Sequence, residues 1–167
     1  MKTIGLISDT HSYLHPSIAT FLAQCNEIWH AGDIGDIETA KAIASIKPLK
    51  AVYGNIDGKE IRSFYPLYQN FMCENLSVLM IHIGGYPGKY SQEAKELISE
   101  LKPRLFISGH SHILKVINDK RNNLLHLNPG AAGKYGMHQV ITAMKFVVED
   151  KDIRDLEILE INRDNKT

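Results

Sequence analysis

The 167-residue sequence has only two cysteines, Cys25 and Cys73, and their spacing is not typical of a metal or redox site. This suits a reducing compartment better than a disulfide-stapled secreted fold, so we expect a cytoplasmic protein in which both thiols are small buried groups. The first residues lack the basic head and apolar stretch of a secretory signal, and no apolar run approaches the ~20 residues of a membrane helix. No membrane partner is expected.

The sequence also has no excess of either charge, because 19 Lys and Arg residues balance 19 Asp and Glu residues. A surface that binds polyanions by counterion release needs a basic surplus, so duplex nucleic acid is not expected as a partner. No repeat, low-complexity segment or long linker divides the chain. At this length we expect one hydrophobic core.

Strand-like and helix-like apolar spacing alternate through the first third of the chain. The pattern predicts strands at residues 2–8, 27–30 and 49–53, with helices at 16–25 and 36–45. This alternation is typical of parallel βαβ units in an α/β fold. Further along, the pattern predicts antiparallel strands at 67–73 and 76–82, a helix at 91–101, a strand at 105–108, and mostly strands from residue 114 onward.

Residues that can bind metals follow the predicted strands at the points where the strands end. They are Asp9, His11, Asp33, Asn55, His82, His110 and His112. The carboxyl ends of parallel strands share one edge of a sheet, where α/β proteins place their ligand sites. Seven side chains that are distant in sequence are therefore expected to converge.

The types and spacing of these residues suit a pair of metal ions. One residue separates Asp9 from His11 and His110 from His112, so in an extended turn both members of each pair point the same way. Asp33 is the natural carboxylate to bridge two ions about 3.5–4 Å apart, which would clamp the attacking and leaving oxygens of a phosphoryl transfer. Carboxylate, imidazole and amide ligands without thiolates favour manganese, iron, nickel or zinc over calcium.

Each candidate also has an ordinary structural explanation when it is taken alone. Asp9 or Asp33 would more often cap a helix, and Asn55 would more often form a turn. The four other histidines, His15, His30, His126 and His138, have this ordinary explanation by default. His30 and His126 also have a second-shell alternative, because "WHAGD" and "HLNPG" lead into predicted site loops.

Six short motifs together resemble the calcineurin-like metallophosphoesterases. They are "SDTHS" from Ser8, "HAGD" from His30, "YGNID" from Tyr53, "IHIGG" from Ile81, "SGHSH" from Ser108 and "LNPGA" from Leu127. The chain is most similar to the small bacterial and archaeal phosphodiesterases that resemble the retromer subunit of eukaryotes. The resemblance implies a single domain over residues 1–167, with an α/β fold in which helices flank a two-sheet β-sandwich in αββα layers.

The resemblance also implies a dinuclear metal centre, with manganese as the first expectation and iron, nickel or zinc as alternatives. Position by position, one ion would bind Asp9, His11, Asp33 and His112. The other would bind Asp33, Asn55, His82 and His110. Asn55 and His110 would also contact the phosphate, which makes them the expected catalytic and substrate-binding residues.

Two positions depart from the family pattern. Ile56 follows the asparagine where most relatives have a histidine and many small bacterial members have a cysteine, so this chain lacks a proton donor there. The family's His-Gly-His is replaced by His82-Ile83-Gly84, which removes a histidine near the first ion. Because loss of a general acid typically costs ~10²–10⁴ in rate, we expect diesters and esters with acidic leaving groups to be preferred.

The expected activity is phosphodiester hydrolysis by a hydroxide that bridges two divalent metal ions, acting on a small phosphate-ester substrate. One alternative is a scaffold, because the retromer subunit looks like a phosphoesterase that serves as a protein-binding platform. Another is a nuclease for short or single-stranded substrates, which no basic aromatic-rich stretch supports. Homo-oligomerisation is left open.

Overall fold

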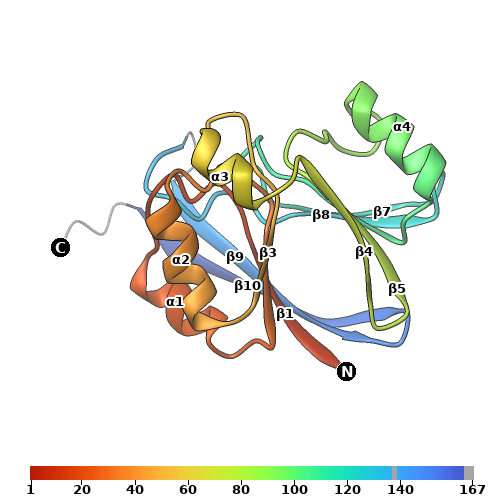
Figure 1. Cartoon of the computed structure of the whole chain (residues 1–167). Helices are drawn as coiled ribbons and strands as arrows, with labels where there is room; N and C mark the ends of the chain where they lie inside the picture. Colours follow the sequence, from red (N-terminus) through yellow and green to blue (C-terminus); the bar gives the residue numbers. More distant parts are fainter. Residues whose placement is uncertain (137–138, 164–167) are drawn as a thin grey trace.

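A computed structural model of the protein describes residues 1–136 and 139–163, and it contains two five-stranded sheets and four helices in this part of the chain (Figure 1). The helices are α1 (Pro16–Leu22), α2 (Ile37–Ile46), α3 (Lys59–Phe64) and α4 (Gln92–Leu101). The strands are β1 (Lys2–Ile7), β2 (Glu27–His30), β3 (Leu49–Ala51), β4 (Tyr68–Cys73), β5 (Leu76–Ile81), β6 (Leu105–Ile107), β7 (Lys115–Asp119), β8 (Leu124–Asn128), β9 (Val140–Glu149) and β10 (Asp152–Asn162).

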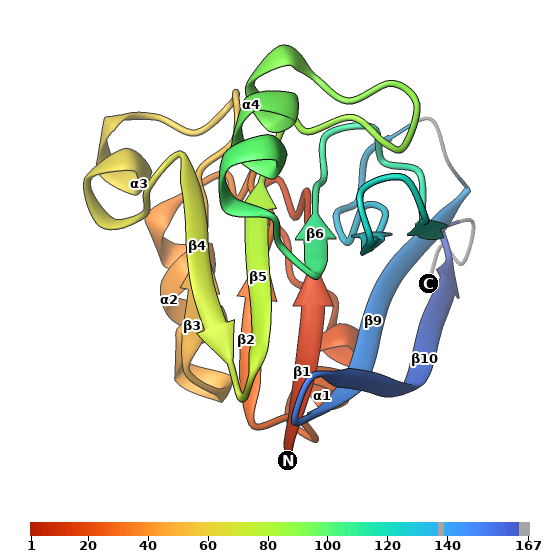
Figure 2. The same ribbon diagram turned by 90° about the vertical axis from the view of Figure 1, so that its right-hand side faces the viewer.

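The first sheet has the order β10-β9-β1-β2-β3, and the second has the order β4-β5-β6-β8-β7. Strands β1, β2 and β3 are parallel, as the alternating pattern predicts. Strands β4 and β5 form the predicted antiparallel pair. The arrowheads of β1, β5 and β6 all point to the same edge, which is the upper one in Figure 2.

Burial on both faces of each sheet explains why the central strands read as continuous apolar runs. In β1, Ile4 and Leu6 face the core between the two sheets, whereas Ile7 faces the helices α1 and α2. In β6, Leu105 and Ile107 face the core between the sheets, and Phe106 faces α4. The alternation gives the layers α1 and α2, first sheet, second sheet and α4, which confirms the αββα sandwich (Figure 1).

The structure corrects several predicted boundaries. The first helix ends at Leu22 instead of Cys25, and β3 ends at Ala51 instead of Tyr53. The apolar pattern does not predict helix α3, because six residues that bury only Ile61 are too few to show a 3.6-residue period. Both free cysteines are buried, as expected. No helix among the described residues is long and apolar enough to cross a membrane.

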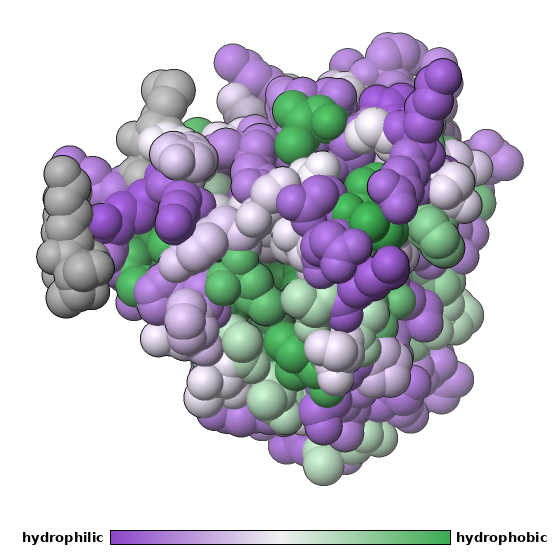
Figure 3. Space-filling view, turned by 60° about the vertical axis from the view of Figure 1, so that its left-hand side comes forward, coloured by the Kyte–Doolittle hydropathy of each residue, from purple (hydrophilic) through white to green (hydrophobic). Residues whose placement is uncertain are grey.

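The outer surface is mixed in character. Figure 3 shows hydrophilic side chains over much of one face, with hydrophobic ones in separate patches between them.

Candidate metal centre

The structure brings all seven candidate residues to the edge where both sheets end. Asp9 and His11 follow β1, while Asp33 follows β2 and Asn55 lies beyond β3. The second sheet contributes His82 after β5, and both His110 and His112 after β6. Six of these residues form two groups whose ligand atoms lie within 4.8 Å of one another: Asp9, His11 and His112 in one group, and Asp33, His82 and His110 in the other.

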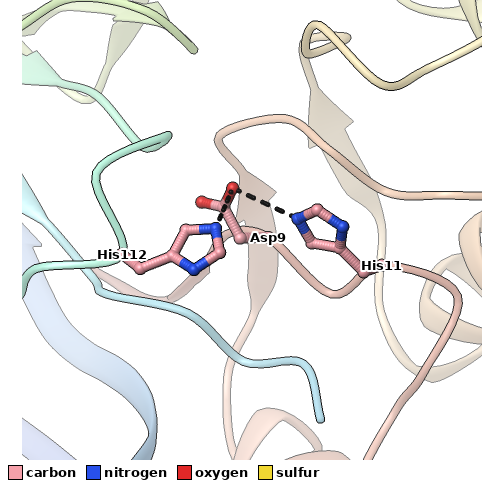
Figure 4. Close-up of side chains that lie close together, drawn as sticks. All are labelled: Asp9, His11 and His112. Atoms are coloured by element: carbon pink, nitrogen blue, oxygen red, sulfur yellow. Dashed lines mark ion pairs between the residues drawn. The ribbon is translucent and has the colours of Figure 1, made fainter. Parts of the chain in front are cut away.

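The first group is centred on one carboxylate oxygen. Asp9 Oδ1 lies 3.2 Å from His112 Nε2 and 3.6 Å from His11 Nε2. In Figure 4 the two imidazoles approach the carboxylate from opposite sides. Ligands held about 2.0–2.2 Å from a common ion lie about 2.8–3.6 Å apart, so this spacing suits a metal ion.

The second group adds the amide of Asn55. His82 Nε2 lies 3.2 Å from Asp33 Oδ2 and 3.1 Å from Asn55 Oδ1, and His110 Nδ1 lies 3.0 Å from the same amide oxygen. The Nδ1–H of His82 donates to the carbonyl of Ala31 over 2.7 Å. The lone pair of Nε2 in neutral His82 therefore faces two oxygen acceptors, an arrangement that requires a cation or a proton between them.

Asp33 lies between the two groups. Its Oδ2 is 3.2 Å from His82 Nε2 in the second group and 3.6 Å from His11 Nε2 in the first. Its other oxygen accepts the N–H of Ile56 over 3.0 Å. The position of Asp33 suits a carboxylate shared by two ions.

Two buried polar atoms of the first group have no hydrogen-bond partner among the described residues: Asp9 Oδ1 and His11 Nε2. The other oxygen of Asp9 is fully engaged, because it accepts from Ser8 Oγ over 2.6 Å and from the backbone N–H of His110 over 3.1 Å. Leaving a buried carboxylate oxygen unpaired is costly unless it binds a cation. The donor set therefore fits a divalent metal ion.

The electrostatics of the cluster favour ionised carboxylates. Burial by itself raises the pKa of Asp9, but the adjacent His11 and His112 outweigh this effect, so the pKa lies below its ordinary value. Burial also raises the pKa of Asp33, and the nearby His82 outweighs it in the same way. The neighbouring Asp9 raises the pKa of His11. Both carboxylates are thus anions that attract positive charge.

Five of the seven candidate residues have backbone φ angles between 47° and 68°, in the left-handed region: Asp9, His11, Asp33, His110 and His112. Each such non-glycine conformation costs of order 1–3 kcal/mol and is typical of functional sites. Backbone hydrogen bonds between loops hold these residues, including Asp9 N–H to Gly32 O, His11 N–H to Asp33 O and Gly109 N–H to His82 O.

Gly54 shows how closely these loops approach one another. A Cβ at this position would collide with both the carboxylate and the backbone nitrogen of Asp33. The absence of a side chain at Gly54 therefore allows the loop of residues 54–56 to lie against Asp33.

His30 links the loops that carry two of the candidate ligands. It is fully buried, and its burial lowers its pKa to about 4. Nδ1 accepts the N–H of Gly32, so the protonated Nε2 donates to Thr10 Oγ1 over 2.9 Å. His30 thus bonds to the residue before Asp33 and to the residue between Asp9 and His11.

His126 and His15 do not belong to the candidate metal centre. His126 on β8 packs against Phe106 and Tyr90, and its Nδ1–H donates to the carbonyl of Phe106 over 3.1 Å. It lies on the α4 side of the second sheet, away from the candidate ligands. His15 caps α1 by accepting the N–H of Ser17, and His138 lies outside the described residues.

Asp57 is not among the candidate ligands, but its carboxylate organises the site. It is 2% exposed and accepts three backbone N–H groups, from Ile34, Gly35 and Gly54, at 2.8–3.1 Å. These bonds join the loop of Asn55 to the loop of Asp33. A signal was present in the sequence, since a carboxylate two residues after a candidate ligand can orient the ligand's own loop.

A family model and two related proteins indicate the same family for this chain. Residues 1–151 match the calcineurin-like phosphoesterase superfamily domain. A probable metallophosphoesterase of Methanothermobacter thermautotrophicus is 30% identical over 135 residues, which is 77% of this chain and 76% of the relative. One of Methanocaldococcus jannaschii is 30% identical over 154 residues, which is 89% of this chain and 77% of the relative.

Solved structures share the fold at lower identity. Vps29 of Entamoeba histolytica superposes with a TM-score of 0.74 at 17% identity, covering 96% of this chain and 99% of that one. Another Vps29 structure from this organism was solved as a complex with zinc. A structure described as a novel archaeal phosphodiesterase has a TM-score of 0.71 at 21% identity, covering 94% of this chain and 99% of that one.

The role of Asp57 can be tested with Asp57→Asn. An amide has one acceptor oxygen and places an NH₂ group against backbone donors, so we expect a loss of about 2–4 kcal/mol in unfolding free energy. Manganese affinity should fall about 10- to 100-fold, as is typical when a ligand's support is lost. Urea unfolding and titration calorimetry measure these two effects.

Asp36→Asn is the matched control for this test. Asp36 uses one carboxylate oxygen, Oδ1, to accept both groups of Thr39 at the start of α2, and asparagine can replace it. Asp57→Asn with the stability and metal affinity of Asp36→Asn would contradict the organising role.

The burial of His126 predicts a pH effect on stability. Burial lowers the pKa of His126 to about 4, whereas the unfolded chain binds this proton near its ordinary value of about 6.5. The contribution of neutral His126 to the free energy of unfolding is therefore fully present above about pH 6.5, and it is lost as the pH falls towards 4. At pH 5 the loss should be about 2 kcal/mol.

Unfolding at pH 7 and pH 5 in the wild type and in His126→Gln measures this contribution. Glutamine keeps a donor for the carbonyl of Phe106 but does not titrate, and the other histidines are the same in both proteins. The wild type should lose about 2 kcal/mol more than the variant between the two pH values. Equal losses would show that His126 does not carry the effect.

Proposed function

Since the chain belongs to the calcineurin-like phosphoesterase superfamily, we propose that it is a metal-dependent phosphodiesterase with a dinuclear centre. The observation that carries this proposal is the arrangement of two donor groups around a shared Asp33 at one edge of the sandwich. Two bound divalent ions would activate a water molecule for attack and neutralise charge that develops on the phosphoryl oxygens. Manganese is the first choice, with iron, nickel or zinc as alternatives.

The candidate ligands divide by exposure into an inner and an outer set. Asp9, Asp33 and His82 are at most 2% exposed, whereas Asn55 and His110 are exposed. The buried carboxylates supply the negative charge that holds cations. Asn55 and His110 line the open side, so they are the residues that would bind and orient a phosphate oxygen.

Ile56 determines which leaving groups are favourable. Its side chain is 47% exposed, and its backbone N–H donates to Asp33. An alkyl group at this position cannot donate a proton to a departing alkoxide. The wild-type protein is therefore proposed to favour phosphodiesters with acidic leaving groups over phosphomonoesters of alkyl alcohols.

A binding platform without catalysis is the second candidate, because the shared fold includes the Vps29 structures. The complete set of seven metal-competent side chains favours the hydrolase. A platform would keep its activity after these side chains are replaced. A nuclease for short substrates is a narrower form of the phosphodiesterase proposal.

Asp33→Asn tests the shared carboxylate. Asparagine can still accept the N–H of Ile56, so the loop is preserved while both metal positions lose negative charge. We expect bound manganese to fall below two ions per chain. Hydrolysis of a diester should fall by about 100-fold or more, since changes outside the ligand shell alone cost about 10- to 100-fold.

Metal analysis after dialysis and steady-state rates with a chromogenic diester provide the measurements. Asp155→Asn, which replaces an exposed carboxylate on β10, is the control and should match the wild type. Two retained ions and a wild-type rate in Asp33→Asn would disprove the shared-ligand assignment.

Ile56→His tests the missing proton donor. The side chain belongs to no buried cluster among the described residues and is 47% exposed, so the substitution should change the melting temperature little. A histidine should raise the rate for esters of weakly acidic alcohols by about 10- to 100-fold and change the rate for nitrophenyl esters much less.

Rates for a series of diesters with graded leaving-group pKa values show how hydrolysis depends on leaving-group acidity in the wild type and in Ile56→His. The slope against leaving-group pKa should be shallower in Ile56→His. Ile56→Gln, which is polar but does not titrate, serves as the control. If Ile56→His lowers the rate equally for all substrates and also lowers the melting temperature, Ile56 has a packing role instead.

A further inference from the structure

A pocket of about 230 Å³ opens beside the second donor group. Asn55 and His82 line it on the side of the metal centre, and its other walls are mostly apolar, with Tyr53, Leu67 and Ile83 among them. The pocket is larger than a cavity of about 150 Å³ that holds benzene in another protein. A six-membered ring attached to a phosphate at the centre would therefore fit.

One wall of the pocket is held in place by the loop of Asn55. The guanidinium of Arg62 lies 4.4 Å from the centre of the Tyr53 ring. The same guanidinium donates through Nε to the backbone carbonyl of Asp57 over 2.6 Å. Asp57 in turn joins the two site loops, so a cation–π contact and hydrogen bonds connect the aromatic wall to the metal centre.

The pocket lining also exposes apolar surface to water. Leu67 is 38% exposed and Ile83 is 45% exposed, although both line a concave surface. Covering such surface with an apolar group is favourable by roughly 25 cal/mol per Å². The walls thus favour an apolar occupant.

The charges of the pocket do not favour a second anionic group. Arg62 and Glu93 each contribute one charge to the lining, and these charges are opposite in sign. A subsite for a further phosphate would need a positive surplus and donors aimed at oxygen atoms. A neutral ring matches both the apolar walls and the balanced charge.

We propose that this pocket binds an aromatic ring carried by one ester group of the substrate, so that the enzyme selects aryl-substituted phosphodiesters. The inference rests on the proposed function, because the phosphate itself must bind at the metal centre. Ile83 and Leu67 are then specificity-determining residues. They contact the ring and make no contribution to the chemistry.

The test uses the full chain loaded with manganese and two non-hydrolysable probes, phenylphosphonate and methylphosphonate. Titration calorimetry gives both dissociation constants without any turnover. The wild type should bind phenylphosphonate at least about 10-fold more tightly, because only that probe can bury a ring. Ile83→Ser and Leu67→Ser should each reduce this preference to about 3-fold or less and leave methylphosphonate binding unchanged.

Ile113→Ser is the matched control. Ile113 is 44% exposed and follows His112 as Ile83 follows His82, but it does not line the pocket. This variant should keep the wild-type preference for phenylphosphonate. The affinity for methylphosphonate reports in every variant whether the metal centre is still formed.

The outcomes separate this inference from the proposed function. Equal binding of the two probes by the wild type would overturn the aryl pocket while leaving phosphate binding at the metals intact. A preference that survives in both Ile83→Ser and Leu67→Ser would also overturn it, because the ring would then bind elsewhere. Failure of methylphosphonate to bind the manganese-loaded wild type would overturn the proposed function and, with it, the inference.

Discussion

The rest of the site depends on the Oδ1 atom of Asp9, which has no hydrogen-bond partner in the part of the chain that the structure describes. This oxygen is buried and faces the ring nitrogens of His11, His82 and His112 at 3.2–3.8 Å. Ser8 and the backbone of His110 occupy the other oxygen of the same carboxylate. A buried anion in this position is stable only near positive charge, which explains why the donors gather where both sheets end.

The loops around this carboxylate adopt conformations that they would not adopt alone. Left-handed backbone at five candidate ligands is unfavourable by itself. Hydrogen bonds of His30 with Thr10 and Gly32, and of Asp57 with the N–H groups that it accepts, hold the loops of Asp9, His11 and Asp33 in place. Neither residue was a proposed ligand. Their contribution is to hold one loop against another, so that the ligand atoms are already at metal-binding distances in the protein.

The residues proposed to select the ester group of the substrate lie on the exposed side of the metal centre. Ile56 and Ile83 directly follow two candidate ligands, Asn55 and His82. Both side chains are close to half exposed. This chain therefore combines a polar interior for metal ions with an apolar rim beside the second donor group, where an ester group would lie.

The sequence by itself determined the alternation of strands and helices in the first third of the chain, the parallel arrangement of β1 to β3, the antiparallel pair β4 and β5, and the residue types at the strand ends. Local periodicity and short motifs carry this information, because it depends on neighbouring residues. The tertiary structure alone decided that Asp57 bonds to three backbone groups and that His126 lies against Phe106, away from the candidate ligands. It also decided that Tyr53, Leu67 and Ile83 share one pocket. These contacts join segments separated by up to 30 residues, and their geometry depends on how loops and sheets pack, which no local pattern encodes.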